Sequence, residues 1–357
     1  MSQWIKTKLG EIVILNYGKA LKAQDRNAGS IPVYSSGGLT GWHNKALINE
    51  QGIIIGRKGT VGKAYLTYGP FWCIDTAYYI LPNPSKYDFV FLFYLLKTLG
   101  LEELNEDSAV PGLNRDTAYS QEILLPSLPE QKAIASVLSS LDDKIDLLHR
   151  QNKTLESMAE TLFRQWFDVD SNDEWQEKNV LDIFTLVGGG TPKTSVAEYW
   201  TDEIPWISGG DISAAHQGYL YSTEKSISLA GLQNSSAKLL PKNSTVISAR
   251  GTVGKYALLA RDMAFSQSNY GIVSKIGSYP FFIYLLVGFI VDDLLTAAYG
   301  SVFDTITTRT FESVNLKFPS LNSIEKFNEE ISPIFSKKET NTQQIKTLEN
   351  LRDTLLP

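Results

Sequence analysis

The sequence is poor in cysteine and histidine, with one cysteine and three histidines among 357 residues. A single cysteine, Cys73, excludes a disulfide within the chain and is typical of a protein from a reducing compartment. The few histidines and the cysteine are too widely spaced for a zinc site, so we expect no bound metal. The first residues lack a basic segment followed by a long apolar run, which argues against a signal peptide. A cytoplasmic location is expected.

Long hydrophobic runs are also scarce. The most apolar run covers residues 281–290 and is followed closely by Asp292 and Asp293. About 20 apolar residues are needed to span a bilayer, so this run is too short. We interpret it as a buried helix and expect no association with a membrane.

Positive charge is not in excess. The formal net charge is −6, and no segment of the chain is a block of lysine and arginine. Binding to nucleic acid would therefore need local clusters of cations, or a partner that supplies positive surface.

Catalytic motifs are missing as well. The sequence has no Asn/Asp-Pro-Pro-Tyr/Phe motif of amino-group methylation and no Gly-x-Ser-x-Gly elbow. The run Gly59-Thr-Val-Gly-Lys63 resembles a phosphate-binding loop, but its glycine spacing is wrong and Ala64 follows the lysine. Asp142 and Asp143 lie on a predicted helix, where a solvent-facing role is the simpler interpretation. We predict no catalytic centre in this chain.

What the sequence does contain is an internal repeat. Gly59–Lys63 recurs unchanged as Gly251–Lys255, and Tyr94-Leu-Leu recurs as Tyr284-Leu-Leu. Other matches keep the same order: Trp4 with Trp175, Ile31–Gly38 with Ile204–Gly210, and Pro126-Ser-Leu with Pro319-Ser-Leu. An ordered series of matches indicates that the chain contains two copies of one unit.

Each copy has the same predicted layout. A part rich in short β-strands and Gly or Pro turns comes first, then an apolar helix (89–99 and 281–295), then one long helix. We therefore predict an α+β fold with two duplicated mixed α/β domains, separated by two long helices that form an antiparallel coiled coil. The predicted segments are 1–128, 129–168, 169–321 and 322–357.

The long helices are predicted from heptad spacing. The predicted seam of the first contains Leu138, Leu141, Ile145, Leu148, Leu155 and Leu162, and that of the second contains Ile331, Ile334, Ile345, Leu348 and Leu355. Lys338, Asn341 and Arg352 also fall on the second seam, where polar residues often fix register, and Pro333 should kink that helix. The alternative is that each helix packs only on its own domain.

The glycine motifs are the candidate binding sites. Gly-Thr-Val-Gly-Lys should form a tight turn between strands, whose backbone N–H groups and nearby cations suit a DNA phosphate. The turns after Ile31–Val33 and Ile204–Ile207 would allow close approach to bases or phosphates. The candidate DNA-binding residues are Tyr34, Ser35, Ser36, Lys58, Thr60, Lys63, Ser208, Asp211, Arg250, Thr252 and Lys255. A purely structural role for these turns remains open.

Two similar but unequal domains at a fixed separation suit a target that repeats at a fixed spacing. Duplex DNA is such a target, because half-sites on one face recur every ~34–36 Å. The two parts of the site should differ in sequence. The alternative is a two-headed protein-interaction scaffold that does not contact DNA.

Several segments carry a family resemblance that covers essentially the whole chain. They are Pro126–Gln131 with the helix that continues to Phe167, Pro111–Arg115, Gly300–Thr305, Leu348–Pro357 and both glycine motifs. The combination resembles the specificity subunits of type I restriction–modification enzymes.

The resemblance implies a set of roles. The segments 1–128 and 169–321 would be target-recognition domains for double-stranded DNA. The helices 129–168 and 322–357 would be conserved spacers that dock two modification (methyltransferase) subunits, which restriction (translocase–nuclease) subunits join. S-adenosylmethionine and ATP would be bound by those partners, and this chain would be a non-catalytic subunit.

Overall fold

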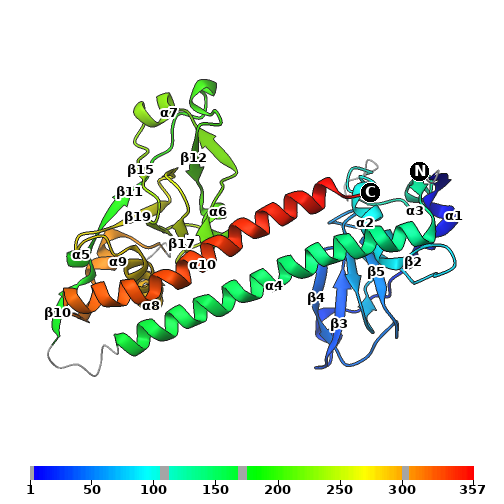
Figure 1. Cartoon of the computed structure of the whole chain (residues 1–357), viewed down its shortest axis with the longest axis horizontal. Helices are drawn as coiled ribbons and strands as arrows, with labels where there is room; N and C mark the ends of the chain where they lie inside the picture. The colour runs from blue at the N-terminus through cyan, green and yellow to red at the C-terminus, as the bar shows by residue number, and fades with distance from the viewer. Residues whose placement is uncertain (1–3, 105–111, 168–174, 300–304) are drawn as a thin grey trace. The chain divides into compact units, whose positions relative to one another are not determined.

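A computed structural model describes residues 4–104, 112–167, 175–299 and 305–357, which form two compact units (Figure 1). The first unit is Met1–Asp146 with Thr347–Pro357, and the second is Leu147–Lys346. Each unit contains one copy of the repeat together with part of both long helices, α4 (Leu128–Trp166) and α10 (Leu321–Thr354).

The first copy contains sheets of strand order β1-β9, β2-β8-β5-β6 and β4-β3-β7. Its strands are β1 (Ile5–Lys8), β2 (Asn16–Tyr17), β3 (Ile31–Ser35), β4 (Gly38–His43), β5 (Gly52–Gly56), β6 (Ala64–Thr67), β7 (Trp72–Cys73), β8 (Ala77–Ile80) and β9 (Glu122–Leu125). Its helices are α1 (Leu9–Ile12), the 3-10 turn η1 (Ala23–Asp25), α2 (Phe89–Thr98) and α3 (Arg115–Tyr119). The Asp88 carboxylate starts α2 by accepting hydrogen bonds from the backbone N–H groups of Val90 and Phe91.

The second copy contains sheets of order β10-β20, β11-β19-β16-β17-β13 and β14-β12-β18-β15. Its strands are β10 (Gln176–Asn179), β11 (Phe184–Gly188), β12 (Ile204–Ile207), β13 (Tyr219–Leu220), β14 (Lys225–Ile227), β15 (Leu239–Leu240), β16 (Thr245–Ser248), β17 (Tyr256–Leu259), β18 (Met263–Phe265), β19 (Asn269–Ser274) and β20 (Asn315–Phe318). Its helices are α5 (Val180–Ile183), η2 (Ala197–Tyr199), α6 (Gly209–Ala214), α7 (Leu229–Gln233), α8 (Pro280–Tyr299) and α9 (Thr308–Glu312).

The two copies share one topology. In each, the first strand pairs antiparallel with the last, β1 with β9 and β10 with β20. The central strand of the larger sheet is β5 between β8 and β6, and β16 between β19 and β17. Both smaller sheets contain a parallel pair, β3 with β7 and β12 with β18. The duplication and the mixed α/β fold predicted from the sequence are confirmed.

The copies differ after the strand that ends in the Ser-Gly turn. The first copy turns directly into the hairpin β3–β4. The second inserts α6, β13, β14, α7 and β15 before it reaches β16. The extra residues that the sequence places near 214–240 therefore add strands to both the larger and the smaller sheet of the second copy, because β13 pairs with β17, β14 with β12 and β15 with β18.

The most apolar helix of the chain, α8, is a core helix. It is long and apolar enough to cross a membrane by length and composition. However, Phe282, Tyr284, Leu286 and Ile290 along it are all buried in the largest hydrophobic cluster of the second unit. The buried-helix interpretation of residues 281–290 is confirmed.

Within the second unit, α4 and α10 pair antiparallel. The ring of Phe163 lies 5.7 Å from that of Phe327, and Asn341 Nδ2 donates to Asn152 Oδ1 at 3.0 Å. Partner numbers on α10 thus rise as those on α4 fall, as the sequence predicted. Pro333 lies inside α10, on its exposed side, and does not end the helix.

The buried seam departs from the strict heptad positions. Leu138, Ile145, Leu148, Ile331 and Ile345 are buried, whereas Leu141, Leu155, Leu162, Ile334 and Leu348 are partly buried. Phe335 takes the buried place beside Ile334, and its ring stacks on Phe281 at 4.4 Å. Leu355 follows the end of α10 and is 45% exposed. Two reasons explain this departure. A helix with 3.6 residues per turn drifts from a seven-residue repeat unless it supercoils, and these helices also bury residues against the globular copies.

Phe327 is the centre of the aromatic packing in the second unit, with its ring 4.9 Å from Phe167 and 6.0 Å from Trp166. We expect Phe327→Ala to lower the free energy of unfolding by about 3–5 kcal/mol, because it leaves a cavity in a buried cluster. Thermal unfolding followed by circular dichroism measures the loss. Leu229→Ala, at a position 52% exposed, is the control. Equal midpoints for both variants would contradict the packing described.

Candidate functional site

The Gly-Thr-Val-Gly-Lys turns have the same backbone conformation in both copies. Gly59 and Gly62 have φ of 82° and 76°, and Gly251 and Gly254 have φ of 79° and 81°. Positive φ is accessible at little cost only to glycine. The turns connect β5 to β6 and β16 to β17, each an antiparallel pair.

The turns are closed by equivalent hydrogen bonds. Gly62 N donates to Gly56 O at 2.8 Å and Gly56 N to Lys63 O at 2.9 Å. In the second copy, Gly254 N donates to Ser248 O at 3.0 Å and Ser248 N to Lys255 O at 2.7 Å. The predicted tight turn between strands is confirmed. A nucleotide loop needs a helix after its glycines, and a strand follows here instead.

Each turn presents two cations to solvent. Lys58 and Lys63 in the first copy, and Arg250 and Lys255 in the second, are all exposed. None of these four side chains forms an ion pair with another residue of the described ranges. Thr60 and Thr252, beside them, are exposed too. A rigid turn with two unneutralised cations is suited to hold a phosphate group.

The end of β3 lies against the first turn. A methyl group placed on Gly37 would come within 3.8 Å of Thr60 Oγ1. Ser35 Oγ accepts a hydrogen bond from Gly37 N at 3.2 Å, and Ser36 is 9% exposed. Tyr34 is half-buried, with its ring 6.3 Å from that of Phe71. These side chains therefore support the loop that approaches the turn.

The end of β12 lies against the second turn, since Thr252 Oγ1 donates to Gly209 O at 3.2 Å. Ser208 and Asp211 form a capping box that starts α6. The Asp211 carboxylate accepts hydrogen bonds from Ser208 N, Ser208 Oγ and Glu224 N. Both residues are thus committed to the local fold.

A third loop, which the sequence reasoning missed, joins the other two in each copy. Arg57 N and Lys58 N both donate to Thr76 O at 3.0 Å, and Ala249 N donates to Ser268 O at 2.9 Å. Thr76 and Ser268 stand at the same offset as the glycine motifs. The equal offset could have revealed this loop in the sequence. However, the hydroxyl that Thr76 and Ser268 have in common is too short a match to be recognised as a motif.

Arg57, which the sequence analysis did not single out, packs against two tyrosine rings. Its guanidinium lies 5.0 Å from the ring centre of Tyr17 and 5.8 Å from that of Tyr78, and its Nη1 donates to Asp75 O at 3.0 Å. Burial raises the pKa of Tyr78 to about 12, so the phenol stays neutral beside the cation.

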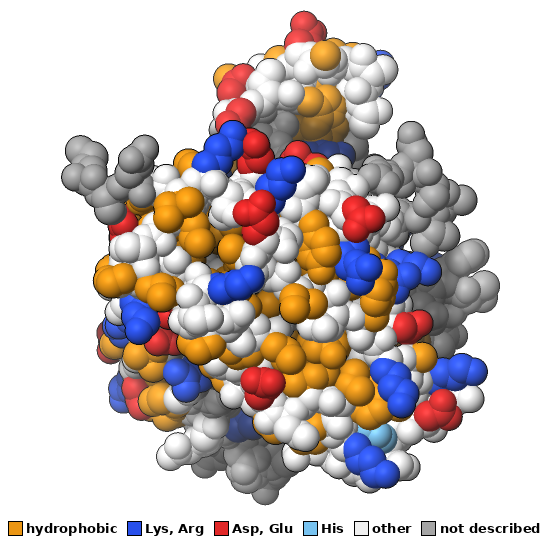
Figure 2. Space-filling model, turned by 90° about the vertical axis from the view of Figure 1, so that its right-hand side faces the viewer, with side chains coloured by type: hydrophobic (Ala, Val, Ile, Leu, Met, Phe, Trp, Pro, Cys, Tyr) orange, Lys and Arg blue, Asp and Glu red, His pale blue; other side chains and the backbone are white. Residues whose placement is uncertain are grey.

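Charge on the molecular surface is mixed. Figure 2 shows a face on which lysine and arginine side chains are scattered among acidic and hydrophobic ones, without a continuous basic patch. This agrees with the net charge of −6. Any contact with phosphates thus depends on local groups such as the turns.

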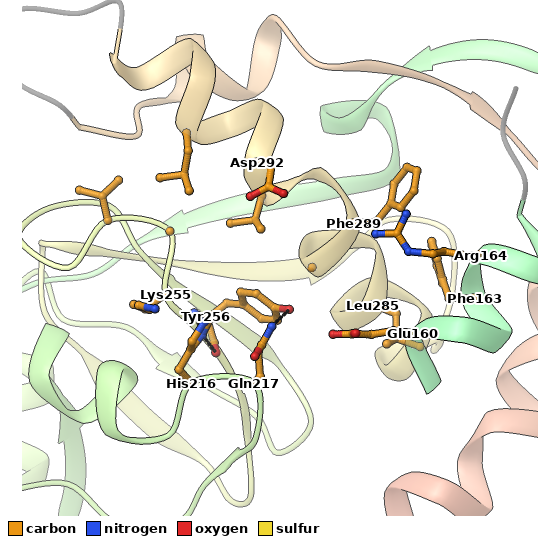
Figure 3. A pocket seen from close by; sticks show the side chains of 15 residues that line it. Glu160, Phe163, Arg164, His216, Gln217, Lys255, Tyr256, Leu285, Phe289 and Asp292 are labelled. Atoms are coloured by element: carbon orange, nitrogen blue, oxygen red, sulfur yellow. Dashed lines mark hydrogen bonds between the residues drawn. The ribbon is translucent and has the colours of Figure 1, made fainter. Parts of the chain in front are cut away.

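A cavity of about 370 Å³ lies beside the second turn (Figure 3). Glu160 and Arg164 of α4, Asp292 of α8, and Lys255 and His216 line it together with apolar side chains. Burial, and then the nearby charge of Lys255, lowers the pKa of His216 below its usual range. A second cavity lies beside the first turn. Lys63 of that turn and Lys97 of α2, the helix equivalent to α8, are among the residues that line it.

Over the parts of the chain that the structure describes, no three His, Cys, Asp or Glu side chains lie close enough to hold a metal ion. Pro111 and residues 300–304, which belong to segments of the family resemblance, lie outside the described residues.

The family model for the type I restriction modification DNA specificity domain matches residues 1–157 and 172–351. The chain therefore belongs to the type I restriction–modification specificity family, whose members are the non-catalytic DNA target-recognition subunits of these systems.

Individual relatives agree with this assignment. The type I restriction enzyme MjaIX specificity subunit of Methanocaldococcus jannaschii is 27% identical over 75% of this chain and 67% of its own length. The HindI specificity subunit of Haemophilus influenzae is 22% identical over 80% of each chain. The crystal structure of the type I S subunit from M. genitalium has the same fold, with a TM-score of 0.65, 16% identity, and coverage of 99% of this chain and 95% of that one.

The conformation of the first glycine turn predicts that Gly62 cannot be replaced without a loss of stability. We expect Gly62→Ala to lower the unfolding free energy by about 2–4 kcal/mol, because φ is positive there and a Cβ would lie 2.3 Å from the Leu101 backbone. Gly69→Ala is the control, since a Cβ on Gly69 meets no atom within 4 Å. Thermal unfolding compares the two, and a Gly62→Ala protein as stable as the control would refute the close approach.

Proposed function

We propose that each copy of the repeat reads one half of an asymmetric, bipartite DNA site. The observation that carries this proposal is the duplicated turn, which has the same glycine conformations, the same hydrogen bonds and two exposed cations in both copies. Lys58 and Lys63, or Arg250 and Lys255, would hold a phosphate and so position each domain on the duplex. Phosphate contacts of this kind set orientation but carry no sequence information.

Sequence would be read by the elements that differ between the copies. In the first copy the hairpin β3–β4 lies next to the turn and exposes Leu39 and Trp42 on its second strand. In the second copy the segment 214–240 occupies the corresponding place in the chain order. Because these elements differ in length and in the helices and strands they contain, the two halves of the site should differ, and the site should not be a palindrome.

The helices α4 and α10 would set the distance between the two halves and dock two modification subunits. Restriction subunits would then join this core. The net charge of −6 supports an assembly in which partners supply much of the positive surface. We propose that S-adenosylmethionine and ATP are bound by those partner subunits and that this chain contributes recognition alone.

Methylation mapping tests the proposal. We expect cells that carry this subunit with its modification and restriction partners to methylate one bipartite motif, with two unlike blocks and a spacer of constant length. Sequencing that detects modified bases reads the motif directly. Methylation at scattered unrelated sequences, or none that depends on this chain, would refute the reading role and favour a scaffold without DNA contact.

The proposed phosphate contacts predict a salt effect. We expect Arg250→Ala to weaken DNA binding by the assembled complex on the order of fivefold to tenfold, with the slope of log K against log salt smaller by about one. The loss should be similar for all DNA sequences. Lys242→Ala, which removes a cation that pairs with Glu339, is the matched control. A changed methylation motif in Arg250→Ala would instead assign this residue to base reading.

A further inference from the structure

Two tyrosines at equivalent positions of the repeat make equivalent contacts with the long helix α4. Tyr94 of α2 donates to Asp142 Oδ2 at 2.7 Å, within the first unit. Tyr284 of α8 donates to Glu156 Oε1 at 2.9 Å, within the second unit. A phenol hydroxyl inside an apolar cluster needs such a partner, so each copy is attached to α4 by a polar bond.

Each of these carboxylates also pairs with a cation of α10. Arg352 Nη1 lies 2.8 Å from Asp142 Oδ1, and Lys338 Nζ pairs with Glu156 Oε2. The first triad is therefore Tyr94, Asp142 and Arg352, and the second triad is Tyr284, Glu156 and Lys338. In both, the globular copy supplies the tyrosine, α4 the acid and α10 the cation.

The triads have equal spacing on both helices. Glu156 follows Asp142 by fourteen residues, and Arg352 follows Lys338 by fourteen. Fourteen residues are two heptads, so each pair of charges returns to the same face of its helix. The two triads therefore belong to one register of α4 against α10.

The aliphatic residues of the seam alone do not distinguish this register from its neighbours. Moving α10 by one heptad would bring Ile331 or Ile345 to the level of Lys338, and apolar contacts would form again. The charges do distinguish it, because Lys338 is 3% exposed and Glu156 7% exposed. Burial lowers the pKa of Lys338 to about 7, the direction expected for a cation that is removed from water.

A second polar layer agrees with the same register. Asn341 Nδ2 donates to Asn152 Oδ1 at 3.0 Å, and Asn152 Nδ2 donates to Thr342 Oγ1 at 3.1 Å. Asn341 is fully buried. In a shifted register this amide would face aliphatic side chains without a hydrogen-bonding partner.

We propose that the two triads select the register of α4 against α10 and thereby determine the spacer length of the DNA site. This inference rests on the proposed function, because only a bipartite reader converts helix register into spacer length. A shift by one heptad is ~10 Å along the helices, which corresponds to about three base pairs at ~3.4 Å each.

The aromatic cluster around Phe327 is the competing determinant of register, since it also joins α4 to α10. The test therefore leaves that cluster intact. It replaces both triads as wholes, with Tyr94→Phe, Asp142→Leu and Arg352→Leu combined with Tyr284→Phe, Glu156→Leu and Lys338→Leu. Replacing all members removes each buried charge together with its charged partner, so the variant should fold. The losses outside the triads include a 3.4 Å hydrogen bond from Lys338 to Gln217 O and the ion pair of Arg352 with the exposed Asp353.

Helix register is measured without DNA. Spin labels on cysteines introduced at Lys153 and Gln344, both exposed in the second unit, report one distance in the parent protein. We expect the triad variant to show a broadened distribution or a second distance. The matched control adds leucines at three exposed neighbours, Asp143→Leu, Ser157→Leu and Ser336→Leu, and should keep the single distance.

Spacer length is measured in the assembled complex by methylation mapping. We expect the triad variant to modify the same two blocks at more than one spacing, with added spacers that differ by about three base pairs. An unchanged label distance and an unchanged spacer would overturn the inference and assign the register to the aromatic cluster. If the parent complex itself shows no bipartite motif, the proposed function fails, whereas the spin-label result still decides the register.

A milder variant covers the case in which the leucine variant does not fold, as judged by circular dichroism. It keeps both tyrosines and combines Asp142→Asn, Glu156→Gln, Lys338→Gln and Arg352→Gln. It removes the charges but retains hydrogen-bonding groups of similar size. The same broadened distances and added spacers are expected, and their absence counts against the triads.

Discussion

The constraint on which the rest of the structure depends is the burial of one apolar helix in each copy. A helix that is hydrophobic on all sides must be covered on all sides. In the first copy, Leu92 and Leu96 of α2 pack in the cluster of the β-sheet, while Phe91 and Leu95 pack with Ile123 and Ala135. In the second, α8 shares one cluster with the sheet, α4 and α10. The helix α4 is thus part of the core of both units, and α10 is part of the core of the second.

This arrangement separates what the two copies share from what distinguishes them. The shared parts are the sheet topology, the apolar helix and the glycine turn with its exposed cations. The distinguishing parts are the hairpin β3–β4 in one copy and the inserted segment 214–240 in the other. In the proposed function these differing elements read the DNA, and they are also part of the fold, since Leu220, Ile227 and Leu240 of the inserted segment are buried in core clusters of the second copy.

Sequence reasoning succeeded where a pattern maps directly onto a backbone. The heptads predicted the ends of α4 and α10 to within about three residues, and the repeat predicted two copies of one topology. It was less successful with side chains. Phe335, Glu156 and Lys338 are buried because three elements meet at their positions, and a seven-residue pattern describes only two helices. Ser208 and Asp211 are candidate binding residues, and the structure adds that they form a capping box, which the sequence analysis did not predict because it did not expect a helix to start there.

By itself, the sequence determined the duplication, the long helices, the buried apolar helix and the turns that require glycine. These follow from periodicity and from the allowed backbone angles, which are local properties of the chain. Only the tertiary structure decided that two further loops meet beside each glycine turn, and that a tyrosine, a carboxylate and a cation from three separate elements form one contact in each unit. The reason is physical: hydrogen bonds and ion pairs between distant segments depend on how elements pack, and packing is set by the whole core and not by any one stretch of residues.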